Sequence, residues 1–201
     1  MAATPRATSR KERSRQAILD ATRELLAEEG SVRTLTVEAV AARSGVAKTT
    51  IYRRWRDKWE LALDAVMLDM VPIFVDMVRF DEPVEASTTR AELHTFIDAV
   101  IKVLASRPYG PAMQGLVSEI ATNPALARAY RERAVEPRIV QLQQLIDRGV
   151  ERGDLRPDTD VRLLHEFLLG PVFYRLLLSG QPLDRNLADR LVDGILSGFA
   201  A

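Results

Sequence analysis

The sequence predicts an all-α fold of about nine helices arranged in two parts. Apolar residues recur every three or four positions over most of the 201-residue chain, which is the period of a helix with one buried face. No stretch shows the strict apolar-polar alternation of a half-buried strand. Glycine, proline and short polar clusters separate the periodic stretches. We therefore expect a small N-terminal helical domain joined to a larger helical one.

The first residues predict an arm and one helix. Residues 1–11 are polar and basic and lack hydrophobic periodicity, so we expect a flexible arm there. Apolar residues then recur at helical spacing over about 13–28. Gly30 is a suitable stop for this helix.

Two short helices around a tight turn are predicted next. Thr36 is a typical N-cap, and the helix that it opens ends at Ser44-Gly45, where glycine can take a positive φ. The second helix, over about 48–55, is rich in Lys, Arg, Thr and Tyr. We place this N-terminal domain at residues 12–58.

The remaining residues, 59–201, predict the larger helical domain. Residues 80–89 have the composition of a linker, and Pro137 should kink or split the helix that contains it near Val135. Asn123 followed by Pro124 marks another helix start. We expect helices over about 57–71, 91–106, 112–121, 124–152, 159–179 and 186–199.

Charge is distributed unevenly along a chain that is neutral overall. The 28 Lys and Arg residues balance the 28 Asp and Glu residues. Residues 1–60 nevertheless hold 13 basic and 8 acidic residues, whereas residues 61–201 hold 15 and 20. A basic N-terminal segment on an acidic remainder indicates that one part meets phosphates and the other does not.

The residues that would support catalysis or metal binding are sparse. There is no cysteine, which excludes disulfides and thiolate metal sites. His94 and His165 have no spacing, to each other or to acids, that suggests a metal site. No glycine-rich phosphate loop or nucleophile elbow occurs. We predict no catalytic residue, no metal and no cofactor.

Membrane and export signals are also missing from the pattern. The most apolar run, residues 167–178, is too short to span a bilayer and contains Arg175. The basic N-terminus has no apolar run after it, so it does not predict a secretory signal. We expect a soluble, cytoplasmic protein with no membrane partner.

The two short helices have the layout of a helix-turn-helix. Such a motif needs a buried face on each helix, a tight turn and a polar outer face on the second helix, which fits the major groove. Val46 and Ile51 can point inward, and Lys and Arg can bond guanine edges or phosphates. Helix N-termini such as that at Thr36 bind phosphate well. The predicted DNA-contacting residues are Thr36, Lys48, Thr49, Thr50, Tyr52, Arg53 and Lys58.

Four further side chains of this region have other expected roles. Trp55 and Trp59 are predicted to pack the second short helix against the next one. Arg54 and Arg56 fit either phosphate contacts or ordinary surface charges.

From Arg13 to about Val66 the chain resembles the N-terminal domain of TetR-type bacterial transcriptional regulators. The matching segments are ILDATRELLAEEG and LTVEAVAARSGVAKTTIYRRW, followed by a Lys and a hydrophobic helix. The resemblance implies a homodimer that binds a palindromic operator and is usually released by a small ligand in its C-terminal domain. The predicted DNA-contacting residues fall on the family's usual contact positions. Ala47 departs from the family's frequent Ser or Thr, and Trp55 from its Phe.

The C-terminal segment RGDLRPDTD…LLGPVFYRLLLSGQPLD resembles one subgroup of TetR C-terminal domains. Its penultimate helix is apolar on nearly all sides, which predicts burial against its own core and against a twin subunit. Burial within one subunit alone is the alternative. The expected interface residues are Leu164, Leu168, Val172, Arg175, Leu191 and Ile195.

A ligand pocket is expected between the helices that follow the linker. Core packing explains each apolar candidate equally well, and the scarcity of charge favours a largely apolar or aromatic effector. The candidate lining residues are Met70, Phe74, His94, Phe96, Tyr109, Met113, Val117, Phe173 and Tyr174.

The sequence therefore predicts a DNA-binding regulator, a repressor that responds to a ligand. One alternative is a DNA-binding regulator without a small-molecule effector. The other is a helical-bundle enzyme or ligand carrier with a vestigial DNA-binding motif.

Overall fold

The computed structural model describes residues 10–67 and 88–199, and in these ranges the chain is helical and contains no strand. The all-α prediction is confirmed. The helices α8 and α9 are joined by the π-helical turn η1, and α10 is continued by a second π-helical turn, η2. In chain order the elements are α1 (Arg10–Glu29), α2 (Val37–Ser44), α3 (Lys48–Tyr52), α4 (Lys58–Met67), α6 (Thr89–Ala105), α7 (Tyr109–Ile120), α8 (Pro124–Tyr130), η1 (Arg131–Val135), α9 (Glu136–Glu151), α10 (Val161–Tyr174), η2 (Arg175–Ser179) and α11 (Arg185–Phe199).

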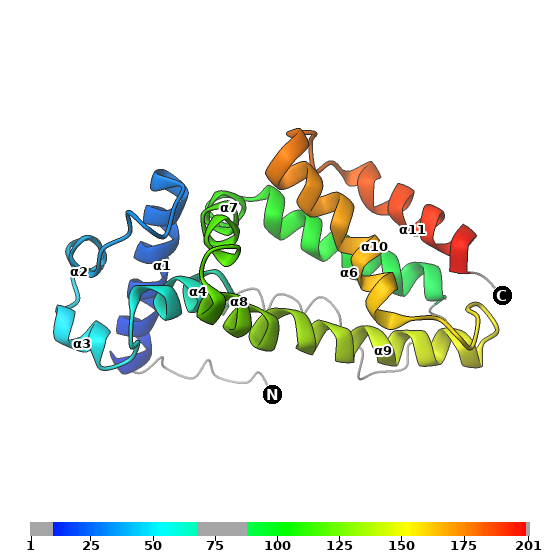
Figure 1. Ribbon diagram of the computed structural model, residues 1–201, viewed down its shortest axis with the longest axis horizontal. Coiled ribbons are helices and arrows are strands. Elements are labelled where there is room, and N and C mark those ends of the chain that lie inside the picture. The colour runs from blue at the N-terminus through cyan, green and yellow to red at the C-terminus, as the bar shows by residue number, and fades with distance from the viewer. Residues whose placement is uncertain (1–9, 68–87, 200–201) are drawn as a thin grey trace, which may run out of the picture.

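The helices form two groups with α7 between them. Figure 1 shows α1, α2 and α3 at one end of the molecule and α6, α10 and α11 at the other. Helix α1 packs against α4 and also against α7, while α4 contacts both α7 and α8. Helix α4 therefore belongs to the boundary between the two groups. No helix in the described ranges is both long enough and apolar enough to cross a membrane.

The helix-turn-helix forms as its local sequence predicts. The Thr36 hydroxyl oxygen accepts a hydrogen bond from the Ala39 amide at 3.1 Å, which caps α2. Gly45 ends α2 with a φ of 67°, a backbone conformation that residues with a Cβ rarely adopt. Val40 and Ile51 are buried with Ile18 of α1, so both short helices share one small core.

Helix α3 is shorter than predicted, because it ends at Tyr52 and not near Trp55. The chain turns there, and the Trp55 side chain enters the core, where it is only 3% exposed. Its indole N–H donates to Asp64 Oδ2 of α4 at 2.9 Å. The packing role predicted for Trp55 is confirmed. Helix α3 ends before Trp55, where the chain turns to bury this side chain.

Pro111 and Pro137 are both accommodated within helices. Helix α7 begins at Tyr109, three residues before the predicted start, with Pro111 in its first turn, which needs no intrahelical amide bond. The irregularity predicted near Val135 is present as the π-helical turn η1, just before Pro137. Its wider turn lets the Glu136 amide bond to the Arg131 carbonyl, so the helix continues from α8 into α9 without a split.

Tight polar and backbone contacts hold the N-terminal helices against α7. Arg33 Nε donates to Glu119 Oε2 at 2.9 Å, and the Ser31 hydroxyl donates to the other oxygen at 3.2 Å. A Cβ added at Gly115 would lie 3.1 Å from the Gly30 carbonyl carbon, so only glycine fits there without a shift. The loop after α1 is therefore fixed to the second group of helices.

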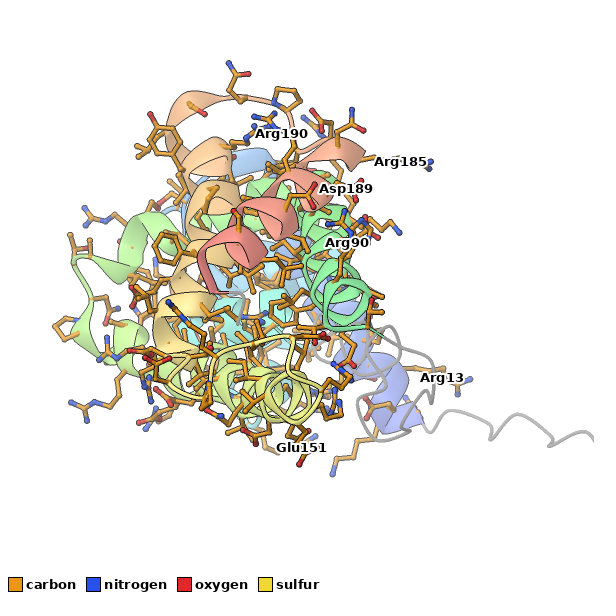
Figure 2. The ribbon with its side chains drawn as sticks, turned by 90° about the vertical axis from the view of Figure 1, so that its right-hand side faces the viewer. Arg13, Arg90, Glu151, Arg185, Asp189 and Arg190 are labelled. Atoms are coloured by element: carbon orange, nitrogen blue, oxygen red, sulfur yellow. The ribbon has the colours of Figure 1, made fainter. Side chains whose placement is uncertain are left out.

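The last helix is fixed to α6 by charge as well as by apolar packing. Figure 2 shows Arg90 of α6 beside Asp189 of α11. The Arg90 guanidinium lies 3.3 Å from an Asp189 carboxylate oxygen and also donates to Asp193. Helices α6, α10 and α11 pack on one another and form the end of the molecule opposite the helix-turn-helix.

Candidate nucleic-acid interface and dimer face

The outer face of α3 carries the polar side chains that the sequence predicts there. Lys48, Thr49, Tyr52 and Arg53 are exposed, and Thr50 is half-buried. Ile51, on the opposite side, is buried in the core that α1 and α2 share. One apolar anchor thus fixes a short helix whose remaining surface is free to meet a partner.

Lys48 is paired within the motif. Its ammonium donates to Glu38 Oε1 of α2 at 2.8 Å. The hydrogen bond and the charges raise the pKa of Lys48 and lower that of Glu38. Both side chains are largely in solvent, so the pair is weak and Lys48 can exchange Glu38 for a phosphate.

Lys58 has partners on the loop between α1 and α2. Its ammonium donates to the Arg33 carbonyl at 2.6 Å and to the Leu35 carbonyl at 3.2 Å, and it lies 5.1 Å from the centre of the Trp59 ring. These contacts fix the loop that leads into Thr36. A DNA contact by Lys58 stays a prediction, and it would have to coexist with this structural role.

A basic hollow of about 510 Å³ lies between the first turns of α1 and the helix-turn-helix. Arg54 NH2 donates to the Lys11 carbonyl at 2.7 Å, and its Nε is buried with no hydrogen-bond partner in the described chain. Arg54 is thus not an ordinary surface charge, whereas Arg56 is highly exposed. The hollow is lined by Arg10, Lys11, Ser14, Gly45, Val46, Ala47, Thr50, Arg53 and Arg54.

Residues 1–11 are predicted to form a flexible arm, but α1 begins at Arg10 and brings its first turns beside α3. The run of basic residues before position 16 was the available signal for this surface. Its contact with α3 is a tertiary feature that helical spacing does not show.

Four of the six residues predicted for the dimer interface are buried inside the subunit, and the other two, Arg175 and Leu191, are half-buried. Leu164, Leu168 and Val172 have no exposed surface, and Ile195 is also buried. The Arg175 guanidinium donates to the Pro182 carbonyl at 2.7 Å, and Leu191 packs against the core. The four buried residues therefore form no exposed face, because a helix that is apolar on all sides does not reveal which side faces inward. A place for Arg175 and Leu191 at an interface stays a prediction.

A different stripe of α10 and η2 is exposed and apolar. Leu163, Phe167 and Tyr174 follow one another at spacings that keep them on one side of the helix, and Phe167 and Tyr174 are 52% and 58% exposed. Leu178, further along, is 77% exposed. An exposed apolar stripe of this kind marks a surface that another molecule covers. We call Leu163, Phe167, Tyr174, Leu177 and Leu178 the α10 stripe.

The predicted pocket residues do not form one group. Phe96 and Met113 are buried in the core, Val117 and Phe173 pack against it, and Tyr109 lies half-buried under the guanidinium of Arg23. Met70 and Phe74 lie outside the described residues.

Two of the polar pocket candidates lie on the surface. His94 of α6 lies opposite Asp189 of α11, with His94 Nε2 3.6 Å from Asp189 Oδ1. Tyr174 belongs to the α10 stripe. His94 is half-buried and Tyr174 is exposed, so a ligand contact by either side chain stays a prediction.

A buried polar cluster in the second group of helices was also missed. Arg138 NH1 donates to the Ala134 carbonyl at 3.0 Å, and burial lowers the pKa of Arg138 and raises that of Tyr130 beside it. Burial, and then the charges of Arg138 and Arg162, lower the pKa of His165 to about 4. His165 Nε2 has no hydrogen-bond partner in the part of the chain that the structure describes.

A helix-turn-helix with an exposed basic face, on a larger helical domain with an exposed apolar stripe, defines the class of DNA-binding transcriptional regulators. The family model described as "Bacterial regulatory proteins, tetR family" matches residues 18–65. A second model, "Tetracyclin repressor-like, C-terminal domain", matches residues 83–195. The chain belongs to the TetR family.

Individual relatives agree with this assignment over nearly the whole chain. The HTH-type transcriptional regulator YdeS of Bacillus subtilis (strain 168) is 30% identical, covering 98% of this chain and 94% of its own. The DNA-binding transcriptional repressor TetR of Mycobacteroides abscessus is 30% identical, covering 80% of each chain. The solved TetR family transcription regulator SCO0332 is 33% identical with a TM-score of 0.70, covering 94% of this chain and all of its own.

Proposed function

We propose that this transcriptional regulator is a repressor that binds a palindromic operator as a homodimer and loses affinity when a small, largely apolar or aromatic molecule binds its second domain. The observation that carries the proposal is the pair of exposed surfaces: a polar face on α3 and an apolar stripe on α10. Such a repressor acts in the cytoplasm, where the bacterial chromosome lies.

The outer face of α3 is proposed to enter the major groove. Thr49 and Tyr52 project from its exposed side, where a hydroxyl can bond a base edge or a phosphate. Lys48 and Arg53 supply positive charge beside them, for guanine edges or phosphates. Thr36, at the N-terminus of α2, and Thr50 are proposed to contact the flanking backbone.

The basic hollow is proposed to hold a phosphate next to the groove. Arg54 has a buried Nε donor there, and Lys11 and Arg10 bring further charge from α1. Phosphate contacts fix the register of a protein on its duplex without reading sequence. The hollow would thus position α3 on the duplex, while the side chains of α3 recognise the base sequence.

The α10 stripe is proposed to meet the same stripe of a second subunit. A two-fold interface pairs one surface with its own copy, which suits an exposed stripe that is apolar along its length. Two copies of α3 can then address half-sites about one helical turn of DNA apart. This dimer replaces the one predicted from Leu164, Leu168 and Val172.

The effector is proposed to bind in the interior of the second domain, near Phe96, Met113, Val117 and Phe173. These side chains come from α6, α7 and α10, and all are apolar. Release then requires that the ligand favour a state in which the two copies of α3 are wrongly placed for the operator. The relative named as a DNA-binding transcriptional repressor supports repression as the output.

The test starts from a duplex that the wild-type chain selects out of random DNA. Fluorescence anisotropy then compares the wild type with Tyr52→Ala and Lys48→Ala on that duplex. We expect both variants to bind more weakly at an unchanged melting temperature. Unchanged affinity in both variants would show that α3 does not recognise the DNA sequence.

The effector needs a separate measurement. A panel of apolar and aromatic compounds is screened for a rise in melting temperature, and each hit is titrated against the preformed complex with the selected duplex. The proposal predicts hits that dissociate the complex. A regulator without an effector would give no compound that does both.

A further inference from the structure

Asp64 of α4 connects the end of the recognition helix to the second group of helices. Its Oδ2 accepts the indole N–H of Trp55 at 2.9 Å. Its Oδ1 accepts from Arg133 NH1 at 2.6 Å. Trp55 lies in the segment that leaves α3, and Arg133 lies in the middle of the π-helical turn η1. One carboxylate therefore bonds elements from both sides of the domain boundary.

Glu60, one helical turn before Asp64, repeats this arrangement. Arg133 NH2 donates to Glu60 Oε1 at 3.4 Å. The other oxygen, Oε2, accepts the backbone amide of Arg56 at 2.9 Å. The Arg133 guanidinium thus joins two carboxylates on one face of α4. Each carboxylate uses its second oxygen to hold a residue just after α3.

The contacts of Asp64 with Trp55 and with Arg133 differ in how much they contribute to stability. The indole N–H of Trp55 is part of a buried side chain, and a buried donor without an acceptor is costly, so Asp64 is needed there. The Arg133 side chain is 43% exposed, and an ion pair so open to solvent contributes little to stability. Its planar fork nevertheless fixes the direction of both carboxylates.

The position of Arg133 links this contact to the interior of the second domain. Tyr130, just before η1, and Arg138, three residues after it, belong to the buried polar cluster. A crevice of about 90 Å³ lies beside Arg133, between α4 and α8. Because this crevice leaves space between α4 and α8, η1 has room to shift. Arg133 would then move the carboxylates of α4 with it. π-Helical turns are frequent at functional sites.

We propose that Arg133 is a positioning residue for DNA recognition: through Asp64 and Trp55 it sets the orientation of α3, and it carries the state of the second domain to the reading surface. The proposal rests on the proposed function, because it requires that α3 reads the operator. Arg133 itself contacts no DNA.

The experiment measures affinity for the selected duplex and melting temperature in four single variants, and then in Asp64→Asn alone and combined with Arg133→Met. Arg133→Met removes the guanidinium fork but keeps an unbranched stem, and Arg133→Lys keeps the positive charge. Tyr52→Ala tests the reading surface. Arg162→Met is the matched control, because Arg162 forms an exposed two-bond pair with Glu136 that touches nothing at α3.

Arg133→Met is expected to lower affinity about 10-fold, within the usual range of coupling between sites, at an unchanged melting temperature. Arg133→Lys should recover part of the loss, and Arg162→Met should bind as the wild type. Adding Asp64→Asn to Arg133→Met should cost no more than the larger single loss, since both act through one contact. If Arg133→Met does not fold, the Arg133→Lys loss and its coupling to Asp64→Asn decide the question.

Three results would overturn the proposal, and they differ in meaning. If Tyr52→Ala weakens binding and neither Arg133 variant does, Arg133 has no positioning role while α3 remains the reader. If Tyr52→Ala has no effect here and Lys48→Ala has none in the test of the proposed function, α3 does not read DNA, and the proposed function fails together with the role of Arg133. Equal losses from Arg162→Met and Arg133→Met would show that the loss does not depend on the contact with Asp64.

Discussion

The recognition helix α3 and the penultimate helix α10 present opposite surfaces from opposite ends of the molecule (Figure 1). Helix α3 buries one isoleucine and exposes lysine, threonine, tyrosine and arginine. Helix α10 buries one apolar side and exposes another, the α10 stripe. A charged face can stay in solvent until it meets phosphates, whereas an apolar stripe is stabilised by being covered. This difference supports the proposal that the chain has two partners of different chemistry.

The largest effect is expected from charge on the α10 stripe. Phe167→Glu combined with Tyr174→Glu would place carboxylates in the middle of the proposed interface, where their desolvation opposes pairing. We expect folded monomers in sedimentation velocity. Operator affinity should fall about 100-fold or more, because the two heads no longer bind as a linked pair.

The buried side of α10 provides the contrast. Leu168→Glu places a charge in the subunit core, since Leu168 has no exposed surface, and should unfold the chain instead of producing monomers. Circular dichroism separates the two outcomes. A Phe167→Glu/Tyr174→Glu chain that still sediments as a dimer would show that the α10 stripe is not the interface.

The next effect concerns His165, on the buried side of α10. Burial, and then the charges of Arg138 and Arg162, lower the pKa of His165 to about 4, while Glu136 opposes this. An unfolded imidazole binds its proton near pH 6.5. The unfolded chain therefore takes up a proton between pH 6.5 and pH 4 that the folded chain does not, so stability falls as the pH falls through this range.

The loss is at most about 3 kcal/mol, and screening by solvent reduces it. Urea denaturation at pH 7 and pH 4.5, at one protein concentration, measures it. His165→Asn should remove this part of the pH dependence. If both chains lose the same stability between these pH values, another group is responsible.

A smaller effect is expected from single side chains of the reading face. Tyr52→Ala and Lys48→Ala should each weaken operator binding by about 1–3 kcal/mol, the usual range for a contact to a base or its backbone. Lys102→Ala, which removes a cation of α6 paired with Asp98, is the control and should have no effect. Anisotropy titrations at one salt concentration make the comparison.

The smallest effect tests the pair between Lys48 and Glu38. Glu38→Gln removes the acceptor of Lys48 and a negative charge near the proposed phosphates. Affinity should rise by a few-fold, on the order of an exposed ion pair. The same change in a Lys48→Ala chain should give a smaller gain. An equal gain in both backgrounds would mean that Glu38 acts on DNA directly and not through Lys48.

The difference between α3 and α10 also explains what the sequence predicts well. The cap at Thr36, the turn at Gly45 and the outer face of α3 depend on local chemistry, because a buried lysine or arginine is costly and a positive φ favours glycine. The residue types alone therefore predict which side of α3 faces solvent. The helical fold follows from periodicity in the same way.

Other features depend on contacts between distant segments. Nothing in the local pattern of α10 separates Leu168, which is buried, from Phe167, which is exposed. The contact of Arg54 with the start of α1 and that of Arg133 with Asp64 join residues far apart in the chain. Periodicity shows that such residues lie on helices, but it does not show which helices meet.

The most direct test of the central claim is the mass of the complex between the wild-type chain and a fluorescent duplex that it selects from random DNA. Sedimentation velocity at the dye's wavelength gives the number of chains on each duplex. The account predicts a palindromic selected sequence and two chains, or a multiple of two, per duplex. A single chain per duplex, or a selection that enriches no sequence, would contradict it.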